Sequence, residues 1–354
     1  SWTDFNPQED VYGWKIDSNL RAYIEGAYQR NMRLAFRVVV DSRDKRTEFT
    51  PQFVKDAGAK GFMNKGKWSP YSDDPVFQKY YTKFVKALAK DFNDPSKVEF
   101  IDGFGLGKWG EYHTMIYSTG DDTPKKAVFD WVTDIYSQAF DKVPVVINYH
   151  RWIGAGKDWV DDEHFAADSE EMLEEAIKKG YSLRHDAFGM TTYYGSWERR
   201  FAKKYRNICP IIMEGGWIVK SHNYWQDPRG YRKDSHEDVR RGEFDDSKEA
   251  HVNMMDFRFG DTESWFKDAF DLVRRFLREG GYRLYPSEIS LPLEVSKKTT
   301  PTIKHCWNNM GWGYCPTNIP QWNQKYKVAF ALLDSETNEV RYTFVDTNTD
   351  LSKW

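Results

Sequence analysis

The chain has 354 residues, enough for one large domain or for one large and one small domain, and 40% of them are hydrophobic, as in an ordinary globular protein. The formal net charge of −3 gives no overall indication of nucleic acid as a partner, and no apolar run approaches the roughly 20 residues of a membrane-spanning helix. Aromatic residues make up 17% of the chain and include 15 Trp, which serve both cores and the flat platforms on which sugar rings stack.

Strand-like apolar runs alternate with amphipathic helical runs over most of the chain. The pattern predicts strands at 33–40, 59–64, 98–104, 143–150, 182–189, 209–216 and 251–259, and helices at 16–31, 74–92, 123–140, 168–180, 196–207 and 264–281. Asp168 is the expected N-cap of its helix, and Gly180 is the expected C-terminal stop. Such alternation predicts parallel strands in a doubly wound sheet or in a (β/α)8 barrel, whose first strand is missing or very short here.

From about residue 288, short alternating runs separated by turn residues replace this pattern. They predict a small antiparallel β-sandwich domain over 288–354, behind a barrel over 1–287. Cys209 is an expected buried thiol, whereas Cys306 and Cys315 are close enough in sequence for a disulfide if the chain is exported. The opening residues are polar and aromatic, which is not a signal peptide and fits a mature or trimmed form.

The stretch GLGKWGEYH, residues 105–113, contains the spacing G-x-G-x-x-G. A dinucleotide-binding loop with this spacing must open directly into a helix, and here a short β-branched and aromatic run follows and stops at Gly120. The bulky Trp109 also stands beside the third glycine, where close packing is needed. We therefore interpret the glycines as a sharp turn after a strand that lets Glu111 project from the strand's carboxyl end, where barrel enzymes carry their catalytic groups.

Glu214 has a similar setting, because it ends the apolar run CPIIM and precedes Gly-Gly-Trp. A buried Glu is costly without a partner, so each of the two residues either pairs with an Arg or serves chemistry. Two carboxylates are what glycosidic cleavage needs, one to protonate the leaving oxygen and one to attack the anomeric carbon or to activate water. We expect apolar and aromatic walls around Glu111, with Trp109 and Trp217 as candidate sugar platforms.

The opening segment SWTDFNPQEDVYGWKID resembles the segment after the first strand in retaining barrel glycosidases of the β-galactosidase-like clan, where a W-x-x-x-x-P-x-x-x-x-Y-x-W run precedes the first helix. GKWGEYH resembles the fourth-strand end that carries the acid/base in that clan, and IIMEGGW the seventh-strand end that carries the nucleophile. HCWNNMGWGYCP followed by VAFALLD resembles a small β-sandwich domain behind such barrels in uncharacterised bacterial proteins.

This resemblance implies a (β/α)8 TIM barrel followed by a small antiparallel β-sandwich domain, with Glu111 as general acid/base and Glu214 as nucleophile of a retaining mechanism. It also implies that Arg37, inside strand 33–40, supports Glu214, although an ordinary Arg at a strand edge fits the residue types equally well. One position departs from the clan, because Gly110 stands where the clan has an Asn that binds the sugar 2-hydroxyl.

Several further polar residues near strand ends form a candidate substrate-binding cleft of cationic character, suited to carboxylate or sulfate groups. These candidates are His150, Arg151, His185, Tyr193, Asp256 and Arg258. The stretches 64–74 and 221–246 are expected loops, and either can border the substrate or be a surface insertion.

The sequence therefore predicts a retaining glycoside hydrolase that cleaves a polysaccharide or oligosaccharide, an acidic or sulfated one being an option, without cofactor or metal. The expected location is secreted, periplasmic or on a bacterial cell surface. A non-catalytic carbohydrate-binding protein on a barrel scaffold is the alternative, which Gly110 keeps open. Another hydrolase or isomerase chemistry on the same fold is a third option. The motifs H-E-x-x-H, G-x-S-x-G and the P-loop do not occur, which argues against zinc proteolysis, serine esterase action and nucleotide hydrolysis.

Overall fold

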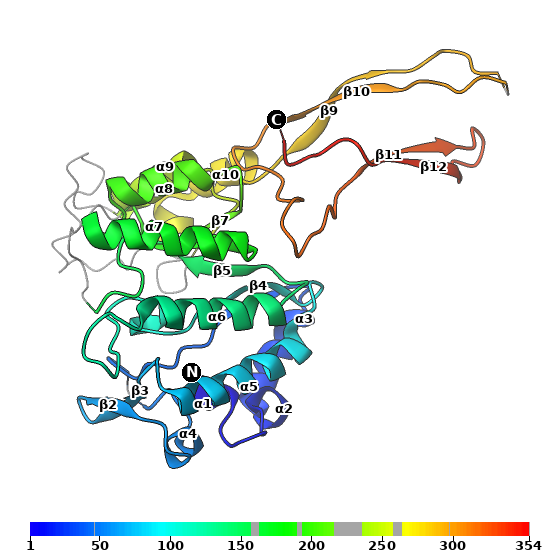
Figure 1. The fold of residues 1–354 in the computed structure, drawn as a ribbon. Coiled ribbons are helices and arrows are strands. Elements are labelled where there is room, and N and C mark those ends of the chain that lie inside the picture. The colour runs from blue at the N-terminus through cyan, green and yellow to red at the C-terminus, as the bar shows by residue number, and fades with distance from the viewer. Residues whose placement is uncertain are drawn as a thin grey trace. The chain divides into compact units, whose positions relative to one another are not determined.

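The structure is a computed structural model that describes residues 1–45, 47–156, 163–189, 193–215, 236–257, 264–296 and 298–353, with the backbone alone at 163–165 and 236–238. The chain divides into two compact units, Ser1–His185 and Asp186–Trp354. The elements up to the boundary are α1 Trp2–Phe5, α2 Gly13–Ile16, α3 Ser18–Tyr28, β1 Leu34–Arg37, α4 Gln52–Asp56, β2 Gly61–Asn64, β3 Lys67–Pro70, α5 Pro75–Phe92, β4 Val98–Asp102, α6 Lys125–Ala139, β5 Val145–Asn148, α7 Glu163–Lys178 and β6 Tyr181–Phe188, which crosses it (Figure 1). The second unit continues with α8 Ser196–Tyr205, β7 Ile211–Gly215, α9 His236–Glu249, β8 Met254–Met255, a π-helical turn Ser264–Asp268, α10 Phe270–Glu279, β9 Leu284–Ser290, β10 Lys304–Asn309, β11 Val328–Leu333 and β12 Val340–Asp346.

The main sheet is parallel, and its strands follow one another in the order β1-β4-β5-β6-β7-β8. A doubly wound sheet reverses its strand order at a switch point, whereas a barrel adds each strand next to the preceding one. The six described strands therefore fit part of the predicted barrel and argue against the doubly wound alternative. The eight-stranded closed barrel stays a prediction.

Helix α5 illustrates how the sequence builds the helical layer of the first unit. The carboxylate of Asp74 accepts a hydrogen bond from the backbone N–H of Phe77 at 2.8 Å, and Pro75 occupies the first turn, where its missing N–H does no harm. The hydroxyl oxygens of Tyr81 and of Tyr136 on α6 lie 2.9 Å apart, and the two helices lie side by side (Figure 1). Much of the aromatic excess is thus core rather than ligand platform.

Two predictions about the first unit are wrong, one on the pairing of a strand and one on the start of a helix. Strand 59–64 was expected in the main sheet, but β2 pairs antiparallel with β3, because positive φ angles of 48° at Lys65 and 76° at Gly66 form a tight hairpin turn. Asp168 is not an N-cap, because α7 already begins at Glu163, and the Asp168 carboxylate instead lies 2.6 Å from Nζ of Lys125. No helix among the described residues is long and apolar enough to cross a membrane.

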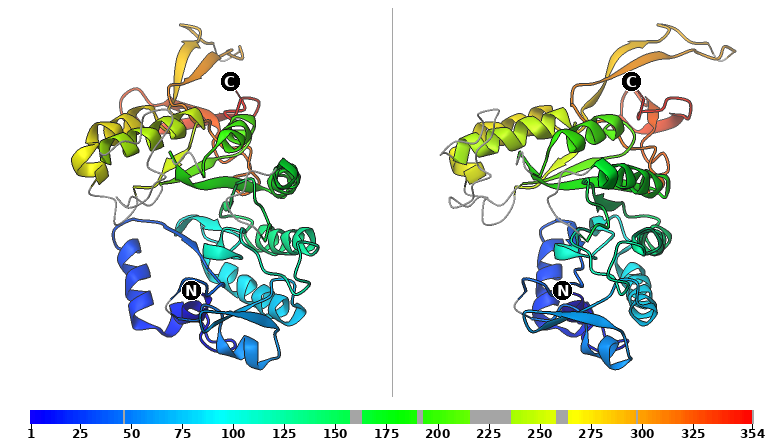
Figure 2. Two further views of the ribbon diagram at one scale, coloured as in Figure 1. Left: turned by 90° about the vertical axis from the view of Figure 1, so that its left-hand side faces the viewer. Right: turned by 60° about the vertical axis from the view of Figure 1, so that its left-hand side comes forward.

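The end of the chain forms two antiparallel hairpins, β9–β10 and β11–β12, which belong to separate two-stranded sheets. The long β9–β10 hairpin is drawn in yellow and orange in Figure 2. The hairpins meet where the rings of His305 and Phe330 lie 5.2 Å apart, beside a small core that contains Val328. The predicted antiparallel structure is confirmed, whereas the sandwich and its boundary at residue 288 stay predictions.

The three cysteines are free thiols. Cys306 is exposed and Cys315 is buried, so the disulfide that their spacing allowed is not formed. Cys209 is buried as predicted, and this burial raises the pKa of its thiol far above the usual value, which makes it a poor nucleophile.

Candidate active site

The loop between β4 and α6 positions Glu111. Gly105, Gly107 and Gly110 have φ angles of 76°, 76° and 79°, in the left-handed region that favours glycine. The loop contains one short 3-10 turn, Lys108–Gly110, which includes the third glycine, and the next helix is α6, which begins at Lys125. No helix N-terminus therefore opens directly from these glycines to hold a pyrophosphate, and their interpretation as a turn that carries Glu111 fits the structure.

Glu111 is buried within a cluster of charged side chains in the first unit, with 5% of its own side chain exposed. Its Oε1 accepts a hydrogen bond from Nη1 of Arg37 at 2.9 Å and lies 3.4 Å from Nη2 of Arg184. Both arginines also contact Oδ2 of Asp102, Arg37 through Nε at 2.8 Å and Arg184 through Nε at 3.4 Å. Two guanidinium groups and two carboxylates thus alternate, and their charges cancel. We call these four residues the charge cluster.

His113 adds a titratable group to this cluster. Its Nε2 lies 3.5 Å from Oε2 of Glu111, and its Nδ1 lies 2.9 Å from the hydroxyl oxygen of Thr114. Sequence reasoning missed His113, Asp102 and Arg184. None of the three has a local signal, because Arg184 stands in the partly polar strand YSLRHDAF and not in an apolar run like that of Arg37.

His150 holds the backbone of the Glu111 loop. Its Nε2 lies 2.7 Å from the carbonyl oxygen of Glu111, and its Nδ1 accepts the backbone N–H of Trp152 at 3.1 Å. A carbonyl can only accept and an N–H can only donate, so the ring carries its proton on Nε2 and is neutral. His150 therefore positions Glu111, and the substrate contact that we predicted for it stays a prediction.

The other candidates of the first unit occupy mixed surroundings. The buried His185 ring lies 4.9 Å from the ring of Tyr149, and the guanidinium of the partly exposed Arg151 lies 4.0 Å from the ring centre of Trp152. Trp109 is partly exposed, and its carbonyl accepts a hydrogen bond from Nη1 of Arg37 at 2.8 Å. Nζ of Lys108 lies 4.3 Å from the centre of the Trp109 ring, and the ring of His113 lies 5.7 Å from it. Neighbouring side chains therefore contact this ring, and its role as a sugar platform stays a prediction.

Two expectations about Glu111 and Arg37 can be compared with these contacts. The apolar walls expected around Glu111 are wrong, because its nearest described partners are charged. The carboxylate partner expected for Arg37 is found twice, in Asp102 and in Glu111, while its pairing with Glu214 stays a prediction. Burial also lowers the pKa of the nearby Lys45, an effect that Asp44 and Glu111 oppose through their charges.

In the second unit, Glu214 is the fourth residue of β7 and is partly exposed. The neighbouring parallel strand β8 pairs Met255 with Met213, and the backbone N–H of Asp256 donates to the carbonyl oxygen of Met213 at 3.0 Å. Glu214 and Asp256 are therefore neighbouring positions of the backbone at the carboxyl ends of two adjacent strands.

A buried ion pair supports the end of β7. Nη1 of Arg240 lies 2.6 Å from Oε2 of Glu243 on α9, and both side chains are fully buried. A Cβ atom built on Gly215 would lie 3.0 Å from Oε1 of Glu243, so a larger residue there would require the ion pair to shift by a few tenths of an ångström. This pair was missed because 221–246 was expected to be a loop, although α9 begins within it.

The remaining candidates are less defined. Tyr193 is partly exposed in a turn before α8, and Trp217 and Arg258 lie outside the described residues. Over the described part of the chain, no group of three or more His, Cys, Asp or Glu side chains is arranged to hold a metal ion.

No model of a known protein family matches the chain, and no curated protein matches it either. Among solved structures, endo-glycoceramidase II from Rhodococcus sp., as a lactosyl-enzyme intermediate, matches 72% of this chain at 14% identity with a TM-score of 0.41, and the match spans 62% of that chain. A mutant structure in complex with xylotriose matches 72% of this chain and 74% of its own at 11% identity, with a TM-score of 0.41. Endogalactoceramidase matches 61% of this chain and 60% of its own at 12% identity, with a TM-score of 0.32. Similarity at this level carries no argument about activity.

Proposed function

We propose that this protein is a retaining glycoside hydrolase that cleaves a polysaccharide or oligosaccharide. The observation that supports the proposal is made within each unit separately: Glu111 lies in the loop that follows β4, and Glu214 is the fourth residue of β7. Barrel enzymes build their active sites from this end of the sheet. Buried ion pairs also accompany each carboxylate: the charge cluster includes Glu111, and the Arg240–Glu243 pair lies beside Gly215, the residue after Glu214. Burial of such charges is costly, which is why we infer that they serve a function.

In this mechanism Glu214 attacks the anomeric carbon and forms a covalent glycosyl–enzyme, while Glu111 protonates the leaving oxygen and later takes a proton from water. The charge cluster assigns different roles to the two oxygens of Glu111. Oε1 is held by Arg37 and Arg184, so the transferred proton belongs on Oε2, the oxygen that faces His113. The proposal requires the two carboxyl groups to approach to about 5 to 5.5 Å in the active enzyme.

The charge balance of the first unit favours a neutral saccharide as substrate. An acidic or sulfated substrate was one option, because polar residues near strand ends, arginines among them, suggested a cationic cleft. Arg37 and Arg184 are balanced by Asp102 and Glu111, so this cluster offers no surplus positive charge. A secreted, periplasmic or cell-surface location would suit such a polymeric substrate.

A carbohydrate-binding protein that has lost catalysis is the second candidate. The observation in its favour is that Glu111 is only 5% exposed, beside Gly110 in the place of the clan's Asn. A catalytic acid must reach the glycosidic oxygen, so this candidate predicts sugar binding without hydrolysis.

The test is reducing-sugar release from a panel of neutral and acidic polysaccharides and aryl glycosides, with the wild type and Glu214→Gln side by side. Release by the wild type that Glu214→Gln abolishes supports the hydrolase and its nucleophile. Release that survives the substitution contradicts the assignment of Glu214. Sugar binding without release from any substrate selects the binding protein.

A further inference from the structure

Asp102 is the member of the charge cluster that lies deepest in the sheet. It is the last residue of β4, and its side chain is only 4% exposed. The parallel register pairs it with Arg37 on β1, so the two side chains lie on the same face of the sheet. Its Oδ2 lies 2.8 Å from Nε of Arg37 and 3.4 Å from Nε of Arg184 on β6. The sheet therefore holds Asp102 against both arginines.

The two arginines by themselves favour the ionised form of Glu111. Their terminal nitrogens lie 2.9 and 3.4 Å from its Oε1, and a cation at such a distance makes a carboxyl group release its proton more readily. A general acid must instead hold its proton until the glycosidic oxygen takes it. Two unbalanced arginines are therefore a poor setting for the acid role that we propose for Glu111.

The charge of Asp102 opposes this effect. Arg37 donates through Nε to Asp102 and through Nη1 to Glu111, so the two carboxylates share one guanidinium. A second carboxylate close by disfavours ionisation of the first. The charge of Asp102 also acts on its other buried neighbours: burial raises the pKa of Tyr136 and Tyr181 above the usual value, and this charge adds to the rise.

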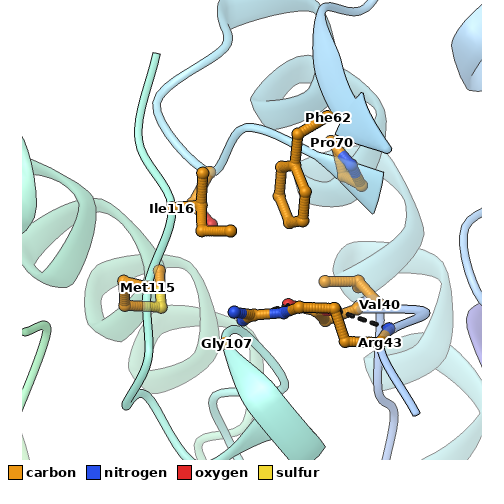
Figure 3. A pocket seen from close by; sticks show the side chains of 9 residues that line it. Val40, Arg43, Phe62, Pro70, Gly107, Met115 and Ile116 are labelled. Atoms are coloured by element: carbon orange, nitrogen blue, oxygen red, sulfur yellow. Dashed lines mark hydrogen bonds and ion pairs between the residues drawn. The ribbon is translucent and has the colours of Figure 1, made fainter. Parts of the chain in front are cut away.

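Other charged or titratable groups of the described chain lie around the Glu111 loop, namely the basic His113 and Lys45, the neutral His150, the exposed Asp44 and the ion pair of Arg43 with Asp41. Lys45 and a protonated His113 add positive charge, which favours the ionised form of Glu111 further. The charge of Asp44 is screened by solvent. The Asp41 carboxylate already accepts hydrogen bonds from Nε and Nη2 of Arg43, beside a small pocket (Figure 3). The balance for the second arginine of the cluster therefore comes from Asp102.

We infer that Asp102 is a positioning residue that shares both arginines with Glu111 and thereby lets Glu111 hold the proton that it donates. The inference rests on the proposed function, which gives Glu111 the acid role. Asp102 acts through Arg37 and Arg184 and transfers no proton itself.

The experiment follows the protonation of Glu111 by infrared difference spectroscopy between about pH 3 and 9, with its carboxyl band assigned by the loss of that band in Glu111→Gln. Asp102→Asn removes one negative charge and should lower the midpoint of the Glu111 titration by about one to two pH units. Arg184→Gln removes a positive charge and should raise the midpoint, while the double variant keeps the net charge and should lie near the wild type. Asp91→Asn removes a carboxylate of α5 that lies 2.8 Å from Nζ of Lys15, and this matched control should leave the midpoint unchanged.

The same proteins are assayed for hydrolysis at each pH. The alkaline fall of kcat/KM reports the acid that must be protonated, so it should move with the midpoint in each variant. Circular dichroism melting checks that each variant folds. If Asp102→Asn does not fold, the double variant is compared with Arg184→Gln, and its midpoint should be lower by the same one to two units, in order of magnitude.

Three results overturn the inference: an unchanged midpoint on loss of the Asp102 charge, shifts of the same sign in Asp102→Asn and Arg184→Gln, and a Glu111 that stays ionised at every pH. Hydrolysis together with one of these results refutes the role of Asp102 and leaves the hydrolase standing. Midpoints that shift as expected in a protein without hydrolysis support the role of Asp102 and refute the hydrolase.

Discussion

The loop after β4 and the end of β7 each present a carboxylate, but different interactions hold the two residues in place. Glu111 comes after a glycine-rich loop and is held by side chains, namely Arg37 and Arg184 on Oε1 and His113 beside Oε2. Glu214 is part of its strand, so the sheet itself fixes its backbone, and the support lies behind it in the pair of Arg240 and Glu243.

This difference shows which carboxylate tolerates change in its surroundings. A residue within a paired strand keeps its place through backbone hydrogen bonds, whereas a residue on a loop depends on each side-chain contact. We therefore expect the Glu111 site to be sensitive to its charge cluster and its glycines, and the Glu214 site to be sensitive mainly to Glu214 itself.

The largest effect is expected for the carboxylate that supplies the proton. Glu111→Gln should lower kcat by about 10² to 10⁴-fold on substrates with poor leaving groups, because protonation of the glycosidic oxygen is lost. The loss should be much smaller for a dinitrophenyl glycoside, whose leaving group needs no proton, while Glu214→Gln should abolish hydrolysis of both. Steady-state kinetics on the two substrates measures this, and equal losses for Glu111→Gln would exclude the acid role.

The next effect concerns the charge cluster. Arg37→Ala leaves Asp102 and Glu111 with one cation fewer in a buried place, so we expect a loss of about 3 to 5 kcal/mol in the free energy of unfolding. Arg21→Ala removes an exposed ion pair with Glu25 and should change the free energy of unfolding by less than about 0.5 kcal/mol. Urea unfolding curves give both values, and similar small losses would mean that the cluster does not hold the first unit together.

Gly110, in the loop after β4, can be compared with Gly120, whose φ angle is nearly the same. Gly110 and Gly120 have φ angles of 79° and 77°, but a Cβ at Gly110 would lie 2.8 Å from Cδ of Arg37, whereas nothing lies within 4 Å of one at Gly120. Both Ala variants bear the conformational strain, and Gly110→Ala should lose a further 1 to 3 kcal/mol, in order of magnitude, because it displaces Arg37. Thermal unfolding compares the stabilities of Gly110→Ala and Gly120→Ala. Equal stabilities would show that the side chain of Arg37 moves aside without a cost in stability.

The smallest effect belongs to the second unit. Burial, assisted by the cation of Arg206, lowers the pKa of His251 to about 4, below its usual value near 6.5. The unfolded chain then takes up a proton first, so this contribution to stability is complete above about pH 6.5 and is lost as the pH falls toward 4. His251→Gln should reduce the loss of stability between these pH values by less than about 1 kcal/mol, since the side chain is partly solvated. Urea unfolding at both pH values checks this, and identical pH dependence in the two proteins would contradict it.

The elements that periodicity determines were predictable from the sequence, and the side-chain contacts were not. The amphipathic run of α5 and the apolar run of β4 appear where the pattern places them, and the positive φ angles of Gly105 and Gly110 follow from the need for a turn. The residues that form the charge cluster with Glu111 come from β1, β4 and β6, which are far apart in sequence, so no local pattern could select Arg184 or Asp102. Helix α9 was missed because its residues are polar on most sides, and its buried pair is decided by packing.

The central claim is that Glu214 forms the covalent intermediate, and trapping that intermediate tests it most directly. The protein is incubated with a 2-deoxy-2-fluoro glycoside of the sugar that it hydrolyses, digested, and its peptides are weighed by mass spectrometry. We expect one added fluorosugar on the peptide that contains Glu214, and none after Glu214→Gln. A fluorosugar on a peptide that contains Glu111, Glu243 or Asp256 instead would show that Glu214 is not the nucleophile.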